Sequence, residues 1–279
     1  MTRGAPMTMV EGDLFPPTPR VLYSKAPLVQ VTCQLRFPPI LRIEKEVPAD
    51  FQDKIRQAFP LFERVGPLLQ QIPPEVLQAI GRDVNPVVYH FISEDRLSTV
   101  ELTPQSLGFT TRSYKYWETF RADLRLSLLA LRAVYQPSFF MRAGLRYQDL
   151  IDRQKLGLDQ VPWSKLLRTE LIGELAIKEL EDNVLGASRT LHVRMPSGRG
   201  TVLLRHGFGV IPGQPQTGYV IDLDFSTEQK TEATNVEHVL SGLHEEVGRA
   251  FRWCITRQLH DALGPTEPNP DELDRVDPH

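Results

Sequence analysis

Residues 117–150 read WETFRADLRLSLLALRAVYQPSFFMRAGLRYQDL and predict a long helix followed closely by a long strand. In the first part, apolar side chains recur at steps of three and four residues, which places them on one face of a helix. Pro137 ends this helix because proline lacks the amide hydrogen that a helix interior needs. The apolar face consists of Trp117, Phe120, Leu124, Leu128, Leu131 and Tyr135. Residues 139–150 then alternate between two faces, as expected of a strand.

The residues before this helix predict a sheet for it to cover. Three short runs are rich in β-branched and aromatic residues and are separated by turn-forming residues, which is typical of an antiparallel meander. These runs are residues 87–92, 96–102 and 106–112. A further strand is predicted over residues 28–37, where apolar and polar side chains alternate until Pro38 and Pro39 end the pattern.

The second half of the chain repeats this order of elements. Predicted strands over residues 190–195, 201–206 and 219–225 precede a helix whose apolar stripe runs continuously from Val236 to Leu259. We therefore expect an α+β protein with two similar halves, each a curved antiparallel sheet packed by a long amphipathic helix. The expected halves are residues 27–150 and 190–263, joined by a helical connector over residues 151–189.

Both ends of the chain lack apolar periodicity. Residues 1–26 contain Pro6, Pro16, Pro17 and Pro19 and predict a flexible N-terminal arm. Residues 264–279 combine prolines with acidic side chains and predict a disordered acidic tail.

The composition is that of an ordinary globular protein. Of the 279 residues, 41% are hydrophobic and 24% charged, and no apolar run approaches the ~20 residues of a membrane-spanning helix. Two cysteines, Cys33 and Cys254, fit a reducing compartment, and the N-terminus lacks the apolar core of a signal peptide. We expect a cytoplasmic protein without a membrane contact or a cofactor. The net charge of -3 argues against a dedicated nucleic-acid binder.

Arginines form the main candidate binding site. Alternation along residues 139–150 puts Arg142 and Arg146 on one strand face, where Arg36 of the strand over residues 28–37 could join them. On the helix over residues 117–135, Arg121 and Arg125 follow each other at a spacing of four residues. The planar guanidinium group suits carboxylates and phosphates, so these arginines predict contact with an anion or with an acidic partner.

Two weaker candidates lie in the second half. Residues 207–218, with Gly207, Gly209 and Gly213, predict a long loop that could contact a partner. Asp222 and Asp224 point to the same face of a predicted strand and are the alternative candidates for metal ligands, although the sequence offers no third ligand and predicts no metal site. Glu245 precedes Arg249 by four residues and predicts an ordinary surface ion pair.

Three segments carry a resemblance to a known family. The segments are residues 27–31 with 35–37, residues 142–149, and Leu243-His244 with Phe251 and Ile255-Thr256. Together they resemble a sporadically distributed bacterial family of uncharacterised proteins that share an Arg-x-Gly-Leu-Arg-Tyr strand. This chain has Gln30 and Asp149 where family members are expected to carry Glu and Asn. The resemblance implies a shared fold and no established activity.

The sequence favours binding over catalysis. It contains neither a phosphate-binding loop that ends in Gly-Lys-Ser/Thr nor a Gly-x-Ser-x-Gly elbow nor a paired-histidine zinc motif. We expect a non-enzymatic protein-binding or regulatory accessory protein. The scattered occurrence that the resemblance implies is similar to that of genes moved with defence or toxin-antitoxin systems. Two alternatives stay open: a metal-dependent hydrolase or nuclease with an unfamiliar site, and a nucleic-acid-binding regulator.

Overall fold

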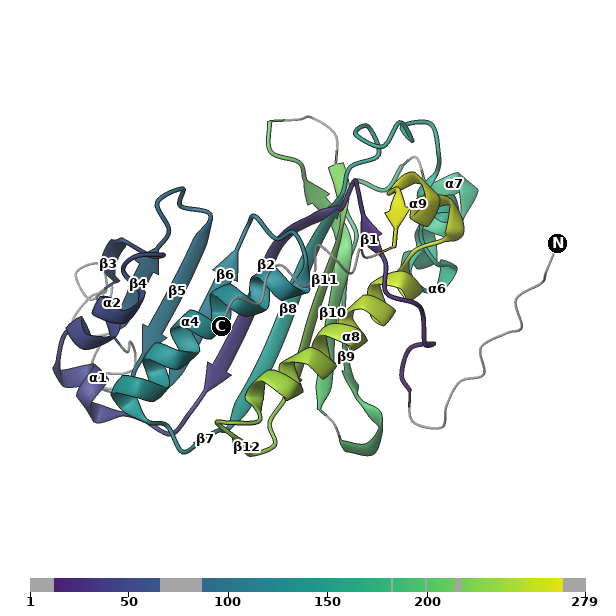
Figure 1. Cartoon of the computed structure of the whole chain (residues 1–279). Coiled ribbons are helices and arrows are strands. Elements are labelled where there is room, and N and C mark those ends of the chain that lie inside the picture. The colour runs from purple at the N-terminus through teal and green to yellow at the C-terminus, as the bar shows by residue number, and fades with distance from the viewer. Residues whose placement is uncertain (1–12, 66–86, 182, 199, 214–216, 268–279) are drawn as a thin grey trace, which may run out of the picture. The chain divides into compact units, whose positions relative to one another are not determined.

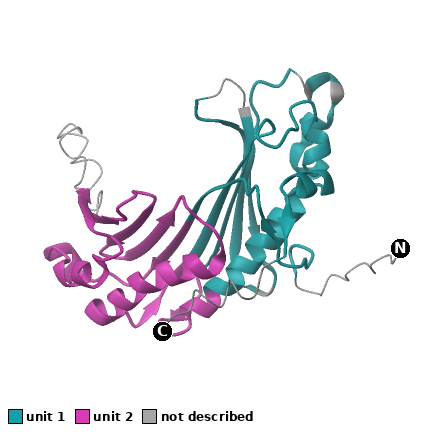
Figure 2. Ribbon diagram, turned by 45° about the horizontal axis from the view of Figure 1, so that its top comes forward, with its two compact units in different colours: residues 1–31, 144–227, 240–279 teal, residues 32–143, 228–239 magenta. Residues whose placement is uncertain are grey.

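The computed structural model describes residues 13–65, 87–181, 183–198, 200–213 and 217–267. It is an α+β protein with a large antiparallel sheet. The chain divides into two compact units (Figure 2). Unit 1 comprises residues 1–31, 144–227 and 240–279, and unit 2 comprises residues 32–143 and 228–239. Each unit is therefore assembled from segments far apart in the sequence, which differs from the expected division into residues 27–150 and 190–263.

Unit 2 is built around the expected meander of three strands. In register, Phe91 of β4 lies opposite Val100 of β5, and Val100 lies opposite Phe109 of β6. In the sheet, β3 lies beside β4, and β2 lies beside β6. The bounds are β2 (Leu28–Arg36), β3 (Leu61–Val65), β4 (Val88–Ile92), β5 (Ser98–Thr103) and β6 (Ser106–Thr111).

The helix α4 (Trp117–Tyr135) lies across one face of these strands (Figure 1). Its predicted apolar face is confirmed from Trp117 to Leu131, since each of those five side chains is buried, and Tyr135 is half-buried. The ring of Phe120 lies 5.0 Å from that of Phe109 on β6. The helix ends where Gln136, one residue before Pro137, turns to a left-handed conformation with φ 50°.

Short elements complete unit 2. The helices α1 (Leu41–Lys45) and α2 (Ala49–Ile55) follow β2, and β7 (Phe139–Phe140) pairs with β12 (Thr231–Glu232). The expected single strand over residues 139–150 is therefore interrupted at Met141, and β8 (Arg142–Ile151) begins after it.

The strands of unit 1 lie in the order β8-β11-β10-β9. Arg205 of β10 lies opposite Asp222 of β11 and Thr190 of β9. The bounds are β9 (Ser188–Arg194), β10 (Thr201–Val210) and β11 (Thr217–Thr227). The expected loop over residues 207–218 is thus wrong at its start, because Gly207 and Gly209 lie within β10 and pair with Val220 and Gly218.

The last long helix is shorter than its apolar stripe predicts. The helix α8 (Val236–Cys254) buries its core-facing side chains from Val236 to Cys254. It ends five residues before Leu259, the predicted end of the stripe, although Leu259 is itself buried. Ile255 leaves the helix to form a β-bridge with Leu167. Thr256 then starts a separate helix, α9 (Arg257–Ala262), by accepting a hydrogen bond from the Leu259 N–H.

The segment between β8 and β9 folds into single helical turns. These are α5 (Trp163–Leu166), α6 (Thr169–Ile172) and α7 (Lys178–Glu181), with 3₁₀ turns at Gly173–Ala176 and, after β9, at Pro196–Gly198. The side chains of Leu166 and Leu171 are buried. The expected helical connector is therefore part of unit 1.

The expected flexible arm is wrong for residues 13–26. Phe15 is buried, with its ring 5.5 Å from Trp253 and 6.2 Å from Phe225. Further on, β1 (Leu22–Tyr23) pairs with β13 (Pro265–Thr266), so the expected tail also begins within the folded part. Residues 1–12 and 268–279, to which the expectations of an arm and a tail also apply, lie outside the described residues.

No helix in the described ranges has the length and hydropathy to cross a membrane.

Candidate functional site

The predicted arginine face does not offer an open anion site at Arg146. Its Nε and Nη2 atoms donate to the two oxygens of Asp222 at 2.8 and 2.6 Å. Arg205 donates to the same carboxylate at 3.3 Å. Hydrogen bonding to Asp222 raises the pKa of Arg146. The charge of Arg146 is therefore neutralised inside the protein, by a residue that we considered as a metal ligand.

This pairing also makes Asp222 a poor ligand for a cation. Asp222 has only 5% of its side chain exposed, and two guanidinium groups already occupy its oxygens. Asp224 does lie on the same strand face, opposite Leu203. In the described part of the chain, no three His, Cys, Asp or Glu side chains lie close enough together to hold a metal ion.

The other predicted arginines belong to unit 2. Arg142 donates to the side-chain oxygen of Gln34 at 3.0 Å, and Arg36 is exposed at the end of β2. On α4, Arg125 is exposed and Arg121 half-buried. The five predicted arginines thus lie on β2, on β8 and on α4, with Arg146 in unit 1 and the other four in unit 2.

The glycines of the predicted contact loop differ in their roles. Gly207 has φ 152°, and a side chain there would overlap the backbone oxygen of Ala187. Phe208 donates its backbone N–H to that same oxygen at 2.8 Å, so the close approach is part of the strand packing. Gly213, with φ 77° and open space around it, is the only one of the three in a surface turn of the described chain.

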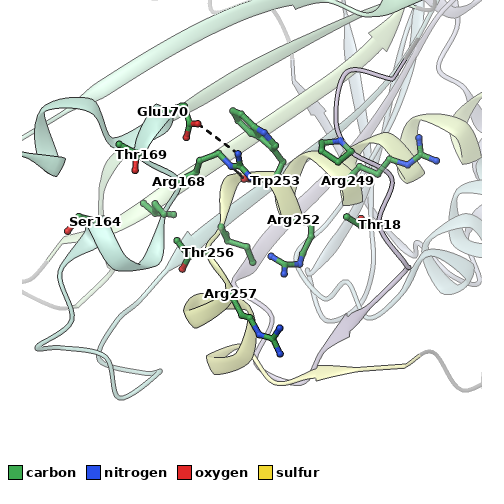
Figure 3. Close-up of a pocket in the computed structure, with 13 residues that line it drawn as sticks. Thr18, Ser164, Arg168, Thr169, Glu170, Arg249, Arg252, Trp253, Thr256 and Arg257 are labelled. Atoms are coloured by element: carbon green, nitrogen blue, oxygen red, sulfur yellow. Dashed lines mark hydrogen bonds and ion pairs between the residues drawn. The ribbon is translucent and has the colours of Figure 1, made fainter. Parts of the chain in front are cut away.

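A cleft in unit 1 is a stronger candidate site. It has a volume of about 510 Å³ and lies where α8 gives way to α9, beside the turn that leads into α6 (Figure 3). Four of its lining residues are arginines, namely Arg168, Arg249, Arg252 and Arg257, and one lining residue, Glu170, is acidic. Sequence reasoning missed this group because its members come from separate elements.

The cleft lies at the break between α8 and α9, where Ile255, Thr256 and Arg257 line it. At the break, Thr256 donates its backbone N–H to the Leu166 oxygen at 2.9 Å, and Arg168 donates its own to the Cys254 oxygen at 3.0 Å. The Thr256 hydroxyl also donates to the Lys165 oxygen at 2.6 Å. These bonds tie the end of α8 to the segment between α5 and α6, and they bring Arg168 beside the α8 arginines.

Arg168 is held in one orientation. Its Nε donates to the Trp253 backbone oxygen at 2.8 Å, and its guanidinium carbon lies 5.0 Å from the centre of the Trp253 ring. Its Nη1 lies 3.9 Å from a Glu170 oxygen, the ion pair drawn in Figure 3. A guanidinium group fixed in this way loses little side-chain entropy when an anion binds.

The remaining arginines differ in how far their charge is already compensated. Arg249 lies 3.5 Å from both Asp13 and Glu246, and not beside Glu245 as the helical spacing predicted. Arg257 lies 3.5 Å from Asp261 in a largely exposed pair, which contributes little and is readily exchanged. Arg252 is half-buried and forms no ion pair or hydrogen bond within the described ranges. Its charge is the one most available to a ligand.

A group of titratable side chains, half-buried at Tyr23 and His260 and buried at Cys254, lies near Arg252. The Tyr23 hydroxyl and His260 Nδ1 are 2.8 Å apart. Burial raises the pKa of Tyr23 to about 12, and burial together with the charge of Arg252 lowers the pKa of His260. Burial also raises the pKa of the Cys254 thiol, so this sulfur stays protonated at neutral pH. Arg252 is thus the main positive charge that acts on Tyr23 and His260, whereas Arg168 acts on Cys254.

Asp149 is the most unusual titratable group of unit 1. It lies on β8 with 5% of its surface exposed. Burial raises its pKa to about 8, and the nearby charge of Asp222 adds to this effect. An acid of this kind is largely protonated at neutral pH.

One sequence signal could have indicated the cleft. Arg249 and Arg252 are three residues apart, and Thr256 follows at a spacing of seven from Arg249, which puts polar groups on one side of a helix that is otherwise apolar. The contribution of Arg168 has no such local signal, because it depends on the Leu167–Ile255 bridge.

Compared with known proteins, the chain matches no family model, and no curated protein matches it.

Proposed function

We propose that this chain is a non-enzymatic binding protein that holds an acidic segment of a partner protein in the cleft of unit 1. The observation that carries the proposal is the convergence of four arginines on one cleft, with Arg252 lacking an acidic partner in the described chain. Carboxylate groups fit the guanidinium fork and form charge-assisted hydrogen bonds with it. Such bonds are stronger than those between neutral groups.

The size of the cleft supports a short peptide segment as the ligand. A volume of about 510 Å³ falls within the range of sites that enclose a small molecule or a few side chains. Thr18, Ser164 and Thr169, which carry hydroxyl groups, are also among its lining residues. A few acidic side chains in an extended segment would therefore meet both charge and polar contacts.

A protein ligand is favoured over a nucleic acid. Proteins that bind single strands commonly stack bases on open aromatic rings. The ring of Trp253, the aromatic residue of the cleft, already contacts Arg168 at 5.0 Å and Phe15 at 5.5 Å. The net charge of -3 also disfavours attraction to a polyanion over long distances.

The cellular setting is part of the same proposal. On the resemblance described above, the partner would belong to a mobile defence or toxin-antitoxin system, and binding would take place in the cytoplasm. We also propose that two segments are equivalent halves of the fold: β4, β5 and β6 with α4, and β9, β10 and β11 with α8. The matching element order supports this equivalence.

Replacing Arg252 by glutamine is expected to weaken the binding of an acidic probe. The probe is a fluorescein-labelled hexaglutamate peptide, and its Kd is measured by fluorescence anisotropy at low salt. Loss of one charge-assisted hydrogen bond costs about 1–2 kcal/mol, so the Kd should rise by about fivefold or more in Arg252→Gln. The substituted side chain is half-buried and has no internal partner, so the fold should persist.

Arg36→Gln is the matched control. It removes the same charge from an exposed position outside the cleft, in the surface that the sequence predicted as the anion site. Its Kd for hexaglutamate should equal that of the wild type. Equal losses in the two variants would refute the cleft as the site. Tighter binding of a labelled single-stranded oligonucleotide than of hexaglutamate would refute the choice of a protein partner.

A further inference from the structure

The last described residues are fixed close to the cleft. Ser24 donates its backbone N–H to the Gly264 oxygen at 2.9 Å, and Lys25 donates to the Leu263 oxygen at 3.0 Å. Together with the pairing of β1 and β13, these bonds hold the chain in place up to Thr266. Residues 268–279 therefore start from a defined point on unit 1.

This starting point lies near the cleft along both strands. On one side, the cleft residue Arg257 begins α9, whose six residues span about 9 Å, and β13 begins three residues after α9 ends. On the other side, β1 begins four residues after Thr18, which also lines the cleft. The twelve residues 268–279 can reach about 40 Å when extended, so the cleft is within their range.

The charge of this segment is opposite to that of the cleft. Residues 268–279 carry four acidic side chains, which are Asp271, Glu272, Asp274 and Asp277, and one basic side chain, Arg275. The difference is a net charge of -3 with histidine neutral. The lining of the cleft holds four arginines against Glu170. A tethered segment also acts at a high effective concentration, on the order of millimolar for short flexible links.

We propose that the acidic segment 268–279 occupies the arginine cleft of its own chain when no partner is bound, and that a partner must displace it. This inference rests on the proposed function, since it assigns the regulation of the same site. The segment then lowers the apparent affinity for every acidic ligand and selects partners that contact the cleft more extensively than the tail does.

A full-length variant with neutral tail side chains tests this competition. In it, Asp271, Asp274 and Asp277 become Asn and Glu272 becomes Gln. Its affinity for labelled hexaglutamate should exceed that of the wild type by about threefold, because the internal competitor is weakened. Arg252→Gln should weaken binding by about tenfold in this background and by less in the wild-type background, since there it also weakens the competing tail.

A control variant separates the tail from overall charge. Four exposed acids that do not line the cleft, Glu94, Asp159, Glu179 and Glu245, are replaced by their amides, which gives the same change in net charge. Its Kd should stay within twofold of the wild-type value. An equal gain in affinity in both variants would overturn the inference, because the gain would then come from net charge alone.

The two proposals fail in different ways. If the tail does not occupy the cleft, the tail variant binds hexaglutamate like the wild type, and Arg252→Gln weakens binding by the same factor in both backgrounds. If the cleft itself is not the site, Arg252→Gln has no effect in either background. A labelled synthetic peptide of residues 267–279 gives the direct measurement: it should bind the tail variant and lose affinity in Arg252→Gln.

Discussion

Raising the pH from 5 to 9 is expected to lower the stability of the wild-type protein steeply, and Asp149→Asn should remove most of this loss. The pKa of Asp149 is about 8 in the folded protein, whereas an aspartate in an unfolded chain has a pKa near 3.9. The folded state therefore holds a proton that the unfolded state has already released over this interval. The stabilisation is fully present below pH ~4 and is lost as the pH rises towards 8.

The expected size of this effect is large. Each pH unit between the two pKa values changes the free energy of unfolding by about 1.4 kcal/mol, so the loss from pH 5 to pH 8 is on the order of 4 kcal/mol. Urea unfolding at several pH values measures it. Asparagine has nearly the same shape as the protonated acid and does not titrate.

Asp95→Asn is the matched control for this measurement. Asp95 is fully exposed, and hydrogen bonds from Ser93 and from the Leu97 N–H lower its pKa. It is therefore ionised in both states throughout the interval, and its replacement should leave the pH dependence of the wild type intact. If Asp149→Asn lost stability between pH 5 and 8 as steeply as the wild type, the buried position of Asp149 would be wrong.

Gly207→Ala is the second substitution with a large expected effect. Its added methyl group would overlap the backbone oxygen of Ala187, and φ 152° is unfavourable for any residue with a side chain. Neither backbone segment can move without loss of strand pairing, so we expect a destabilisation of about 3 kcal/mol or more. Thermal and urea unfolding measure this change.

Gly213→Ala provides the comparison. This glycine also has a positive φ of 77°, but nothing lies within 4 Å of the added atom. The expected cost is about 1 kcal/mol, from the backbone conformation alone. Similar costs at the two positions would mean that Gly207 belongs to an open loop, as the glycine-rich sequence suggested, and not to β10.

The sequence predicted the elements whose pattern is local. The stripe from Trp117 to Leu131 and the alternation over residues 28–37 depend only on the spacing of apolar side chains, and both elements form as expected. A helix stripe shows which residues face a core. It does not show where a helix stops, because the stripe of the last helix continues past the break at Ile255.

The errors arose where contacts distant in sequence decide the structure. Residues 13–26 have no periodicity, yet Phe15 is buried against Trp253 and Phe225, which lie more than 200 residues away. Arg146 was expected to bind an anionic ligand. Instead, it forms an ion pair with Asp222, which lies on β11. In each case the deciding partner comes from another strand or helix, and a single sequence does not reveal which partner that is.

Hydrogen–deuterium exchange of the tail variant, with and without saturating hexaglutamate, identifies the segments that bind the anion. The tail variant is used so that the acids of the chain do not compete with the probe. We expect slower exchange on binding in residues 163–172 and 249–257, which contribute most of the residues that line the cleft, with α4 and β8 unchanged. Slower exchange in α4 or β8, around Arg121, Arg125 and Arg142, with residues 249–257 unchanged, would contradict it and place the anion site on the arginines that the sequence first indicated.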